Sequence, residues 1–182
     1  MAKLAADVYG EALFDLAAET GSIDAWTEQI KTAELVFSEN PDFMGLLTHP
    51  KITKEEKLSV VEKVFGGRFD DAVTGLLTVI VEKGRCREIP AVFANFLERV
   101  REYRKIGVAS IVSATELSDA QKKRIEAKLL SQTKYESFQM QYFVDASLIG
   151  GMVIRIGDRV VDASIKSKLA RMAGNLSKIQ LS

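Results

Sequence analysis

The hydrophobic pattern of this 182-residue sequence changes its period once, near Gly107, and this change constrains the fold more than any other feature. Before Gly107, apolar residues recur at gaps of three and four, as they do on one face of an α-helix. After it, short runs rich in β-branched residues are typical of strands. We therefore expect two domains, residues 1–105 and residues 106–182, with a boundary near Ile106.

The N-terminal half is predicted to form six helices. The clearest pattern belongs to the second helix, where Ile23, Trp26 and Ile30 share one face. Thr53 and Glu56 have the spacing of a capping box at the start of the fourth helix. Short breaks between helices favour a compact antiparallel bundle. The expected helices span about residues 3–20, 23–39, 41–47, 54–65, 69–83 and 88–104.

The C-terminal half begins with a strand–helix–strand pattern. Residues 108–114 are small and β-branched, and residues 138–144 alternate between apolar and polar side chains, which indicates strands. Between them, Ser118 and Gln121 form a second capping box, which predicts a helix. This order is typical of a crossover unit with two parallel strands.

A hairpin is predicted next. Residues 152–156 and 159–161 are rich in β-forming residues, and only Gly157 and Asp158 separate them. A two-residue loop containing glycine suits a tight hairpin turn. Gly150–Gly151 precedes the hairpin, where a side chain would obstruct a bulge or a close approach of the backbone.

A last helix follows the hairpin, and either Asp162 or Ser164 is expected to cap it. Its apolar residues fall on one face, namely Ile165, Leu169, Met172, Leu176 and Ile179. The expected fold class is therefore α+β with two domains. An N-terminal six-helix antiparallel bundle precedes a small α/β domain with a β-hairpin and a C-terminal helix.

The two halves of the sequence also differ in net charge. The chain carries 25 basic and 25 acidic residues, but residues 1–105 have a net charge of −4 and residues 106–182 a net charge of +4. Overall neutrality argues against a polyanion-binding protein. The basic run 122–124 has no interleaved aromatic residues, so we expect no nucleic-acid partner.

Four acidic residues recur every four positions in the first helix, namely Asp7, Glu11, Asp15 and Glu19. This spacing predicts a solvated helix face, and the alternative is a docking surface.

The sequence offers little catalytic chemistry. His49 is the only histidine and is expected to be structural or solvated. Cys86 is the only cysteine, and although Arg85 and Arg87 flank it, no catalytic partner accompanies it. The sequence has no metal-ligand spacing and no phosphate-binding glycine loop. We therefore expect no catalytic, metal-binding or cofactor-binding residues, no nucleotide, and no direct membrane insertion, because no apolar run approaches about 20 residues.

Several motifs, in this order along the chain, resemble the delta subunit family of F-type ATP synthases, which includes the mitochondrial oligomycin-sensitivity-conferring protein. The run Tyr9–Ala17 matches the start of the family, although Gly10 stands where the family usually has alanine. Residues 47–52 and 82–85 match its middle, and residues 145–165 match its C-terminal signature. Within that signature we assign structural roles to Gly150, Gly151, Gly157, Asp158 and Asp162.

The resemblance implies a non-catalytic stator subunit that couples ion-driven rotation to ATP synthesis. It implies that residues 1–105 bind the catalytic head and that residues 106–182 bind the peripheral stalk formed by the b subunits. It also implies a peripheral location at the cytoplasmic face of the bacterial cell membrane. The alternative is a soluble two-domain protein–protein adaptor unrelated to ATP synthase.

The resemblance further implies a groove between the first and fifth helices that takes the amphipathic N-terminal helix of an alpha subunit. The matching positions are Tyr9, Ala12, Leu13, Leu76, Val79 and Ile80. Gly10 and Gly75 are expected to help the partner helix approach closely. Alternatively, Leu76 and Ile80 belong wholly to the core of the bundle and not to a groove. The core alternative is weaker for Val79.

Overall fold

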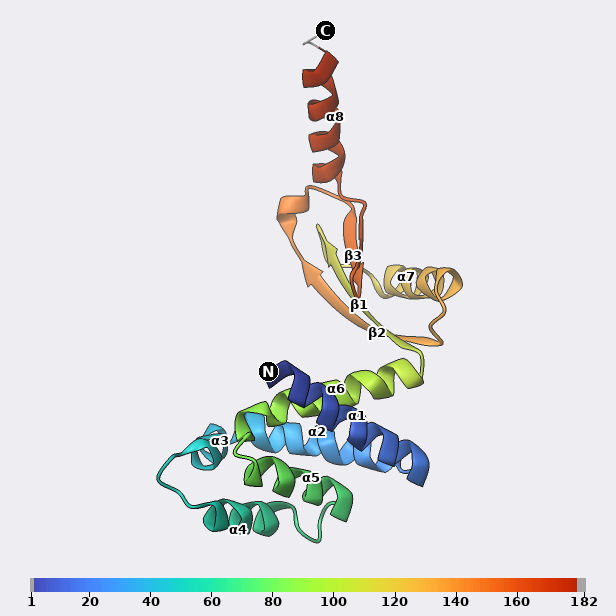
Figure 1. Ribbon diagram of the computed structural model, residues 1–182. Coiled ribbons are helices and arrows are strands. Elements are labelled where there is room, and N and C mark those ends of the chain that lie inside the picture. Colours follow the sequence, from blue (N-terminus) through green and yellow to red (C-terminus); the bar gives the residue numbers. More distant parts are fainter. Residues whose placement is uncertain (1, 180–182) are drawn as a thin grey trace. The chain divides into compact units, whose positions relative to one another are not determined.

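The structure is a computed structural model that describes the backbone of residues 2–179 and the side chains of residues 5–172 (Figure 1). The chain divides into two compact units, residues 1–100 and residues 101–182. The first unit is helical and the second contains a sheet, so the predicted α+β fold class is confirmed.

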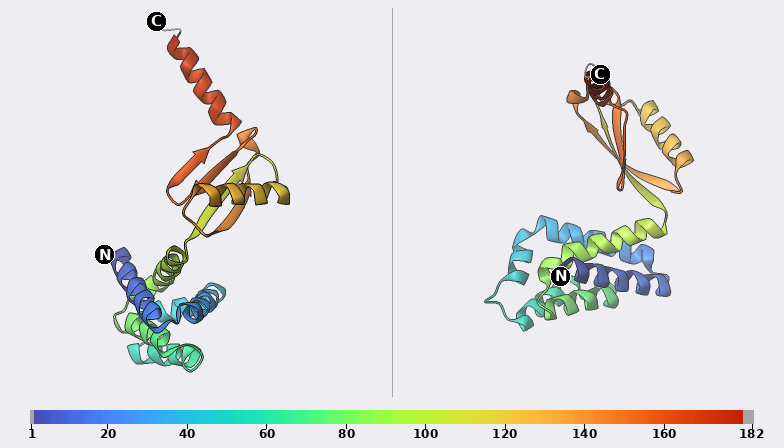
Figure 2. Two further views of the ribbon diagram at one scale, coloured as in Figure 1. Left: turned by 90° about the vertical axis from the view of Figure 1, so that its right-hand side faces the viewer. Right: turned by 45° about the horizontal axis from the view of Figure 1, so that its top comes forward.

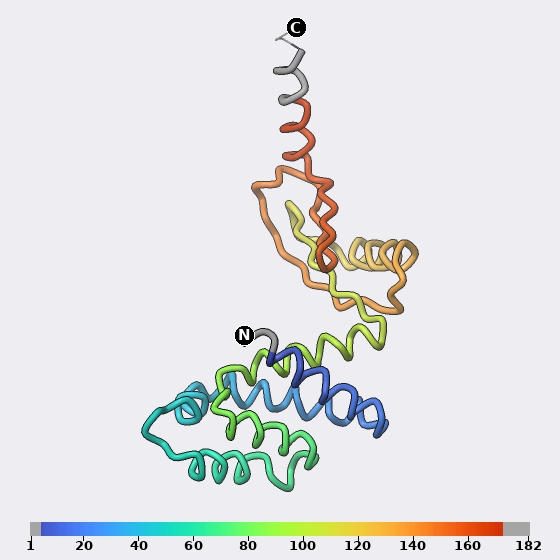
Figure 3. The backbone as a smooth tube through the Cα atoms, viewed as in Figure 1, coloured from blue at the N-terminus to red at the C-terminus, as the bar shows by residue number. Residues whose placement is uncertain are grey.

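The first unit is built from helices joined by short connections, as Figure 3 shows along the chain. Its 3₁₀ turn η1 (Cys86–Glu88) directly precedes the last helix. The helices before the sheet are α1 (Ala2–Thr20), α2 (Ile23–Glu39), α3 (Pro41–Thr48), α4 (Lys54–Phe65), α5 (Asp71–Glu82) and α6 (Ile89–Tyr103).

Aromatic residues from three helices meet in the core of this unit. The ring of Phe37 lies 6.0 Å from the ring of Phe65 and 6.0 Å from that of Phe93, measured between centroids. Trp26 and Ile30 of α2 are also buried, as their helical spacing predicts. The core therefore joins α2, α4 and α6 through apolar contacts.

The helix ends follow local side-chain chemistry. The capping box at α4 is present, because Glu56 N donates to Thr53 Oγ1 at 3.3 Å and Thr53 N donates to Glu56 Oε2 at 3.0 Å. Helix α5 begins two residues later than expected, because Asp70 Oδ1 accepts a hydrogen bond from Ala72 N at 3.0 Å and caps the helix there.

The second unit holds a four-stranded sheet in the order β2-β1-β3-β4. β1 and β2 are parallel and are joined through α7, whereas the β1–β3 and β3–β4 pairs are antiparallel. The elements are β1 (Ile106–Ser113), α7 (Asp119–Gln132), β2 (Ser137–Val144), the 3₁₀ turn η2 (Ala146–Leu148), β3 (Met152–Ile156), β4 (Arg159–Asp162) and α8 (Ile165–Ile179).

Helix α7 lies on one face of this sheet (Figure 2). Ala109 and Ile111 of β1 are fully buried on that face, and Phe138 of β2 is buried with Leu129 of α7. Because side chains alternate along a strand, Ala109 and Ile111 lie on the same face and form the apolar floor beneath α7. The capping box of Ser118 and Gln121 at the start of α7 is also present.

The predicted hairpin is confirmed. Ile156 pairs directly with Arg159, which leaves Gly157 and Asp158 as a two-residue loop. Gly157 has φ +53°, and Asp158 is not among the residues with positive φ, as expected for a type II′ turn. Of the face predicted for the last helix, the side chains of Leu176 and Ile179 lie outside the described residues.

Candidate partner-binding surfaces

Helices α1 and α5 contact each other in the first unit and carry the six residues assigned to the alpha-subunit groove. Ala12 of α1 and Val79 of α5 are exposed, Val79 to 39%. Tyr9 and Leu76 are half-buried and pack against the core. These four residues reach the surface, and we refer to them with Val8 and Leu16 as the α1–α5 surface.

The other two assigned residues lie beneath that surface. Leu13 is 4% exposed and Ile80 is fully buried, and both belong to the core cluster of the bundle. They are therefore placed to support Tyr9 and Leu76 from below, and little of either side chain is open to a partner. This placement agrees with the core alternative for Ile80, but Leu76 keeps a partly open side chain.

Val8 and Leu16 also lie on this surface, although their place there was not predicted from the sequence. They are 57% and 42% exposed, so α1 leaves a line of three apolar side chains open at positions 8, 12 and 16. Their spacing of four residues was a usable signal, because such residues share one flank of a helix. The helices that contact α1, among them α2 and α5, therefore leave part of its apolar surface open.

Gly10 does not belong to the α1–α5 surface, and this corrects the expectation that it helps a partner helix approach. Gly10 is buried against Asn95 of α6, and a Cβ added at position 10 would clash with Asn95 Oδ1 and lie 2.8 Å from Asn95 Cβ. The glycine therefore allows α1 to pass close to α6. By contrast, a Cβ added to Gly75 of α5 would meet no atom within 4 Å.

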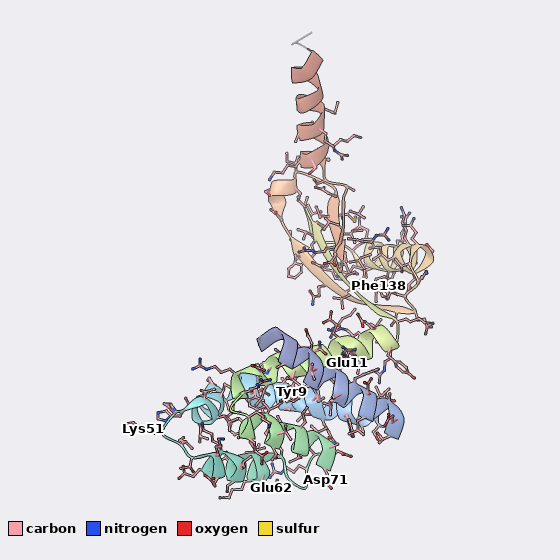
Figure 4. The ribbon with its side chains drawn as sticks, in the orientation of Figure 1. Tyr9, Glu11, Lys51, Glu62, Asp71 and Phe138 are labelled. Atoms are coloured by element: carbon pink, nitrogen blue, oxygen red, sulfur yellow. The ribbon has the colours of Figure 1, made fainter. Side chains whose placement is uncertain are left out.

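Two members of the acidic row on α1 are bound to the same helix α6. Asn95 Nδ2 donates to Asp7 Oδ1 at 2.9 Å, and Arg99 lies 3.0 Å from Glu11 in an ion pair. Figure 4 labels Glu11 and Tyr9, which helical geometry places on different flanks of α1. The acidic row thus fixes α1 against α6 in part, while the apolar flank remains open.

In the second unit, three residues of the C-terminal signature lie where the sheet meets α8, namely Gly150, Gly151 and Asp162, whereas Gly157 and Asp158 form the hairpin loop. Ile165 N donates to Gly150 O at 2.9 Å. Gly151 has φ +79°, and a Cβ at this position would clash with Ala163 O and lie 3.1 Å from Ser164 Cα. Only glycine combines this conformation with so close a backbone approach.

Asp162 and Ser164 together cap α8. Asp162 Oδ1 accepts from Ser164 N at 2.9 Å, and Asp162 Oδ2 accepts from the Ser167 hydroxyl at 2.6 Å. Ser164 Oγ in turn accepts from Ser167 N at 3.2 Å. The hydrogen bonds that Asp162 accepts, with that from Ser167 Oγ the largest cause, lower the pKa of Asp162 to about 2.

Neither Cys86 nor His49 forms part of a catalytic site among the residues that the structure describes. Cys86 is buried, and burial raises the pKa of its thiol, so the flanking arginines do not make it a reactive thiolate. His49 is exposed, and its Nδ1 accepts a hydrogen bond from Lys51 N at 3.2 Å.

Within the described residues, no group of three His, Cys, Asp or Glu side chains is arranged to hold a metal ion. Among those residues, no helix combines the length and the apolar character needed to span a membrane.

Comparison with known proteins shows which protein family the chain belongs to. The family model described as "ATP synthase delta (OSCP) subunit" matches residues 5–176. The ATP synthase subunit delta of Lachnoclostridium phytofermentans is 55% identical over 181 residues, which cover 100% of both chains. The chain belongs to the ATP synthase delta (OSCP) subunit family. A second delta subunit, from Halalkalibacterium halodurans, is 35% identical over 90% of both chains.

A solved structure shares the fold of the delta subunit family. The match is to a chain in the cryo-EM structure of the Toxoplasma gondii mitochondrial ATP synthase hexamer, with a TM-score of 0.72. It covers 94% of this chain and 96% of that one at 20% sequence identity, so it supports the fold alone.

Membership of the delta family establishes the role of the chain within the ATP synthase complex. The chain is a non-catalytic subunit of a bacterial ATP synthase, a stator component that links F1 to the peripheral stalk. The alternative of an adaptor unrelated to ATP synthase is therefore set aside.

Proposed function

We propose that this subunit binds the N-terminal segment of an alpha subunit on the α1–α5 surface and the b subunits on its C-terminal domain. The division of labour follows the two predicted domains, residues 1–105 for the head and residues 106–182 for the stalk. Bound in this way, the subunit sits peripherally at the cytoplasmic face of the bacterial cell membrane and has no need of a nucleotide or a cofactor.

The observation that carries the proposal is the open apolar flank shared by two contacting helices. Val8 and Leu16 of α1 and Val79 of α5 are 57%, 42% and 39% exposed. An amphipathic helix is recognised by such a surface, because each of its apolar residues finds an apolar partner there. A contact that buries roughly 800 Å² on each partner is of the size that gives a stable interface.

The opposite charges of the two halves support binding to two different bodies. Residues 1–42 hold nine acids but only Lys3 and Lys31 as basic residues, whereas residues 106–182 carry a net charge of +4. Complementary charge favours encounter with the correct partner at each end. Two contacts on one chain also increase the effective concentration of each partner for the other.

The test of the head-binding surface is the Val79→Asp variant. A carboxylate at this exposed position would have to be desolvated against an apolar partner helix, so binding should weaken by about tenfold or more. Isothermal calorimetry with a synthetic peptide of the alpha-subunit N-terminus measures the affinity. The fold should persist, because Val79 is not part of the buried core.

Leu35→Asp is the matched control for this experiment. Leu35 is 58% exposed on α2 and does not belong to the α1–α5 surface. The control should bind the peptide as the unchanged chain does. Equal affinity of Val79→Asp and the unchanged chain would show that the surface is wrongly assigned.

A further inference from the structure

One helix covers only part of the sheet in the second unit. Neighbouring strands lie about 4.8 Å apart, so four strands span roughly 14 Å, whereas a helix with its side chains is about 10 Å wide. Helix α7 contacts β2, at one edge of the sheet. The half of the same face formed by the β3–β4 hairpin is left without a helix of its own.

The uncovered half of this face forms an apolar cleft between α7 and the hairpin. Its volume is about 490 Å³. Val161 of β4 is 60% exposed and pairs with Ile154 of β3, so both side chains belong to the α7 face. The large apolar side chains that line the cleft are Ile125, Leu129, Met152, Ile154, Ile156 and Val161.

Among the residues that the structure describes, the charged residues that line the cleft are all basic. They are Arg124 and Lys128, one helical turn apart on α7. Arg159 pairs with Ile156 and so stands on the same face of the sheet. An apolar floor with a basic rim is complementary to an amphipathic helix that carries acidic residues beside its apolar stripe.

We infer that the α7–hairpin cleft binds an acid-flanked amphipathic helix contributed by the b subunits, which lies beside α7 and completes the helical layer over the sheet. This inference rests on the proposed function, because it takes the b subunits as the partner of the C-terminal domain. It adds the site and the character of the helix that occupies it.

The charge of α8 argues against α8 as the occupant. Helix α8 also exposes apolar side chains, among them Leu169 at 52%. However, Lys166, Lys168 and Arg171 make the first part of α8 basic, and its first seven residues include no acid. Placing α8 in a cleft with a basic rim would bring like charges together, which is unfavourable.

Two adjacent valines of β4 provide the test. Val161 faces the cleft, whereas Val160 pairs with Arg155 on the opposite face, and the two are 60% and 55% exposed. The full-length variants Val161→Asp and Val160→Asp therefore introduce the same charge at similarly exposed positions on opposite faces. Binding to purified b subunits should weaken on the order of tenfold for Val161→Asp and stay unchanged for Val160→Asp.

A second pair of variants tests the basic rim. Lys128→Glu changes a residue that lines the cleft, and Lys123→Glu changes an exposed residue of the same helix that does not. Only Lys128→Glu should weaken binding, by several-fold, and its effect should shrink as salt is raised. Circular dichroism checks that all four variants keep their secondary structure.

The outcomes separate the inference from the proposed function. If the unchanged chain fails to bind the b subunits, the proposed function is wrong. If it binds them but Val161→Asp and Val160→Asp bind equally well, the cleft is not the site. If Val161→Asp instead dissociates a dimer of this chain, or increases hydrogen exchange in α8 with b binding intact, a second copy or α8 is the occupant and the inference is overturned.

Discussion

Asp162 shows at the scale of one residue how the signature sequence is tied to structure. Its carboxylate accepts hydrogen bonds from Ser164 N and Ser167 Oγ and closes the first turn of α8. A carboxylate also interacts favourably with the positive end of a helix dipole. One charged side chain thereby joins the end of β4 to the start of α8.

The same carboxylate predicts how the start of α8 responds to acid. The pKa of Asp162 is about 2 in the folded chain, below the ordinary value of 3.8, so the ionised form favours the folded state. Its contribution to stability is therefore complete well above pH 3.8 and is lost as the pH falls from there through about 2.

Ser167→Ala tests this assignment. The variant removes the hydrogen bond that lowers the pKa of Asp162 most, so that pKa should rise toward its ordinary value, with the backbone N–H of Ser164 still lowering it in part. Carbon-13 NMR of the aspartate carboxyl groups during an acid titration measures the change. Ser59→Ala, in an exposed position on α4, is the control, and an unaltered Asp162 titration in Ser167→Ala would refute the role of its hydroxyl.

At the scale of elements, the packing of α1 against α6 depends on Gly10, which was expected to lie at a partner-binding surface instead. Gly10 gives room to Asn95, whose side chain also hydrogen-bonds to Asp7 and Arg99. Helix propensity alone favours alanine over glycine by about 1 kcal/mol. The close approach at Gly10 opposes that preference, because the nearest atoms include Asn95 Cβ, which moves only with its backbone.

Gly10→Ala should therefore destabilise the chain, by about 1 kcal/mol after the gain in helix propensity offsets part of the overpacking. Gly75→Ala is the matched change within α5, where an added Cβ meets no atom within 4 Å, and it should stabilise the chain by about 0.5–1 kcal/mol. Urea denaturation measures both variants. Stabilisation by Gly10→Ala would show that α1 and α6 are not held this closely.

The elements were predictable because their signals are local. The box of Thr53 and Glu56, and the loop of Gly157 and Asp158, each act over a few residues, and the structure contains both. The function of Gly10 was not predictable, because it depends on Asn95, 85 positions away in the sequence.

The surface residues were only partly predictable for a related reason. Periodicity places Leu13 and Val8 in one broad apolar stripe of α1, yet Leu13 is 4% exposed and Val8 57%. Which part of a stripe is covered depends on where the neighbouring helices lie. The cleft beside α7 was missed in the same way, because the strand pattern of Ile154 and Val161 does not reveal how far one helix covers their face.

At the scale of the whole molecule, we propose one binding surface and one partner for each unit. The α1–α5 surface belongs to the helical unit, and the α7–hairpin cleft belongs to the unit with the sheet. No reaction is required of either, which agrees with the non-catalytic character of the delta family. The subunit acts in the stator by holding two larger bodies at once.

The measurement that tests this account most directly is capture of the catalytic head by immobilised b subunits. With the unchanged chain present, the head should be retained, and without the chain it should be lost. Val79→Asp should stay on the b subunits but retain less of the head, whereas Val161→Asp should bind the head but be held less well by the b subunits. Retention of the head at an undiminished level without the chain would contradict the account.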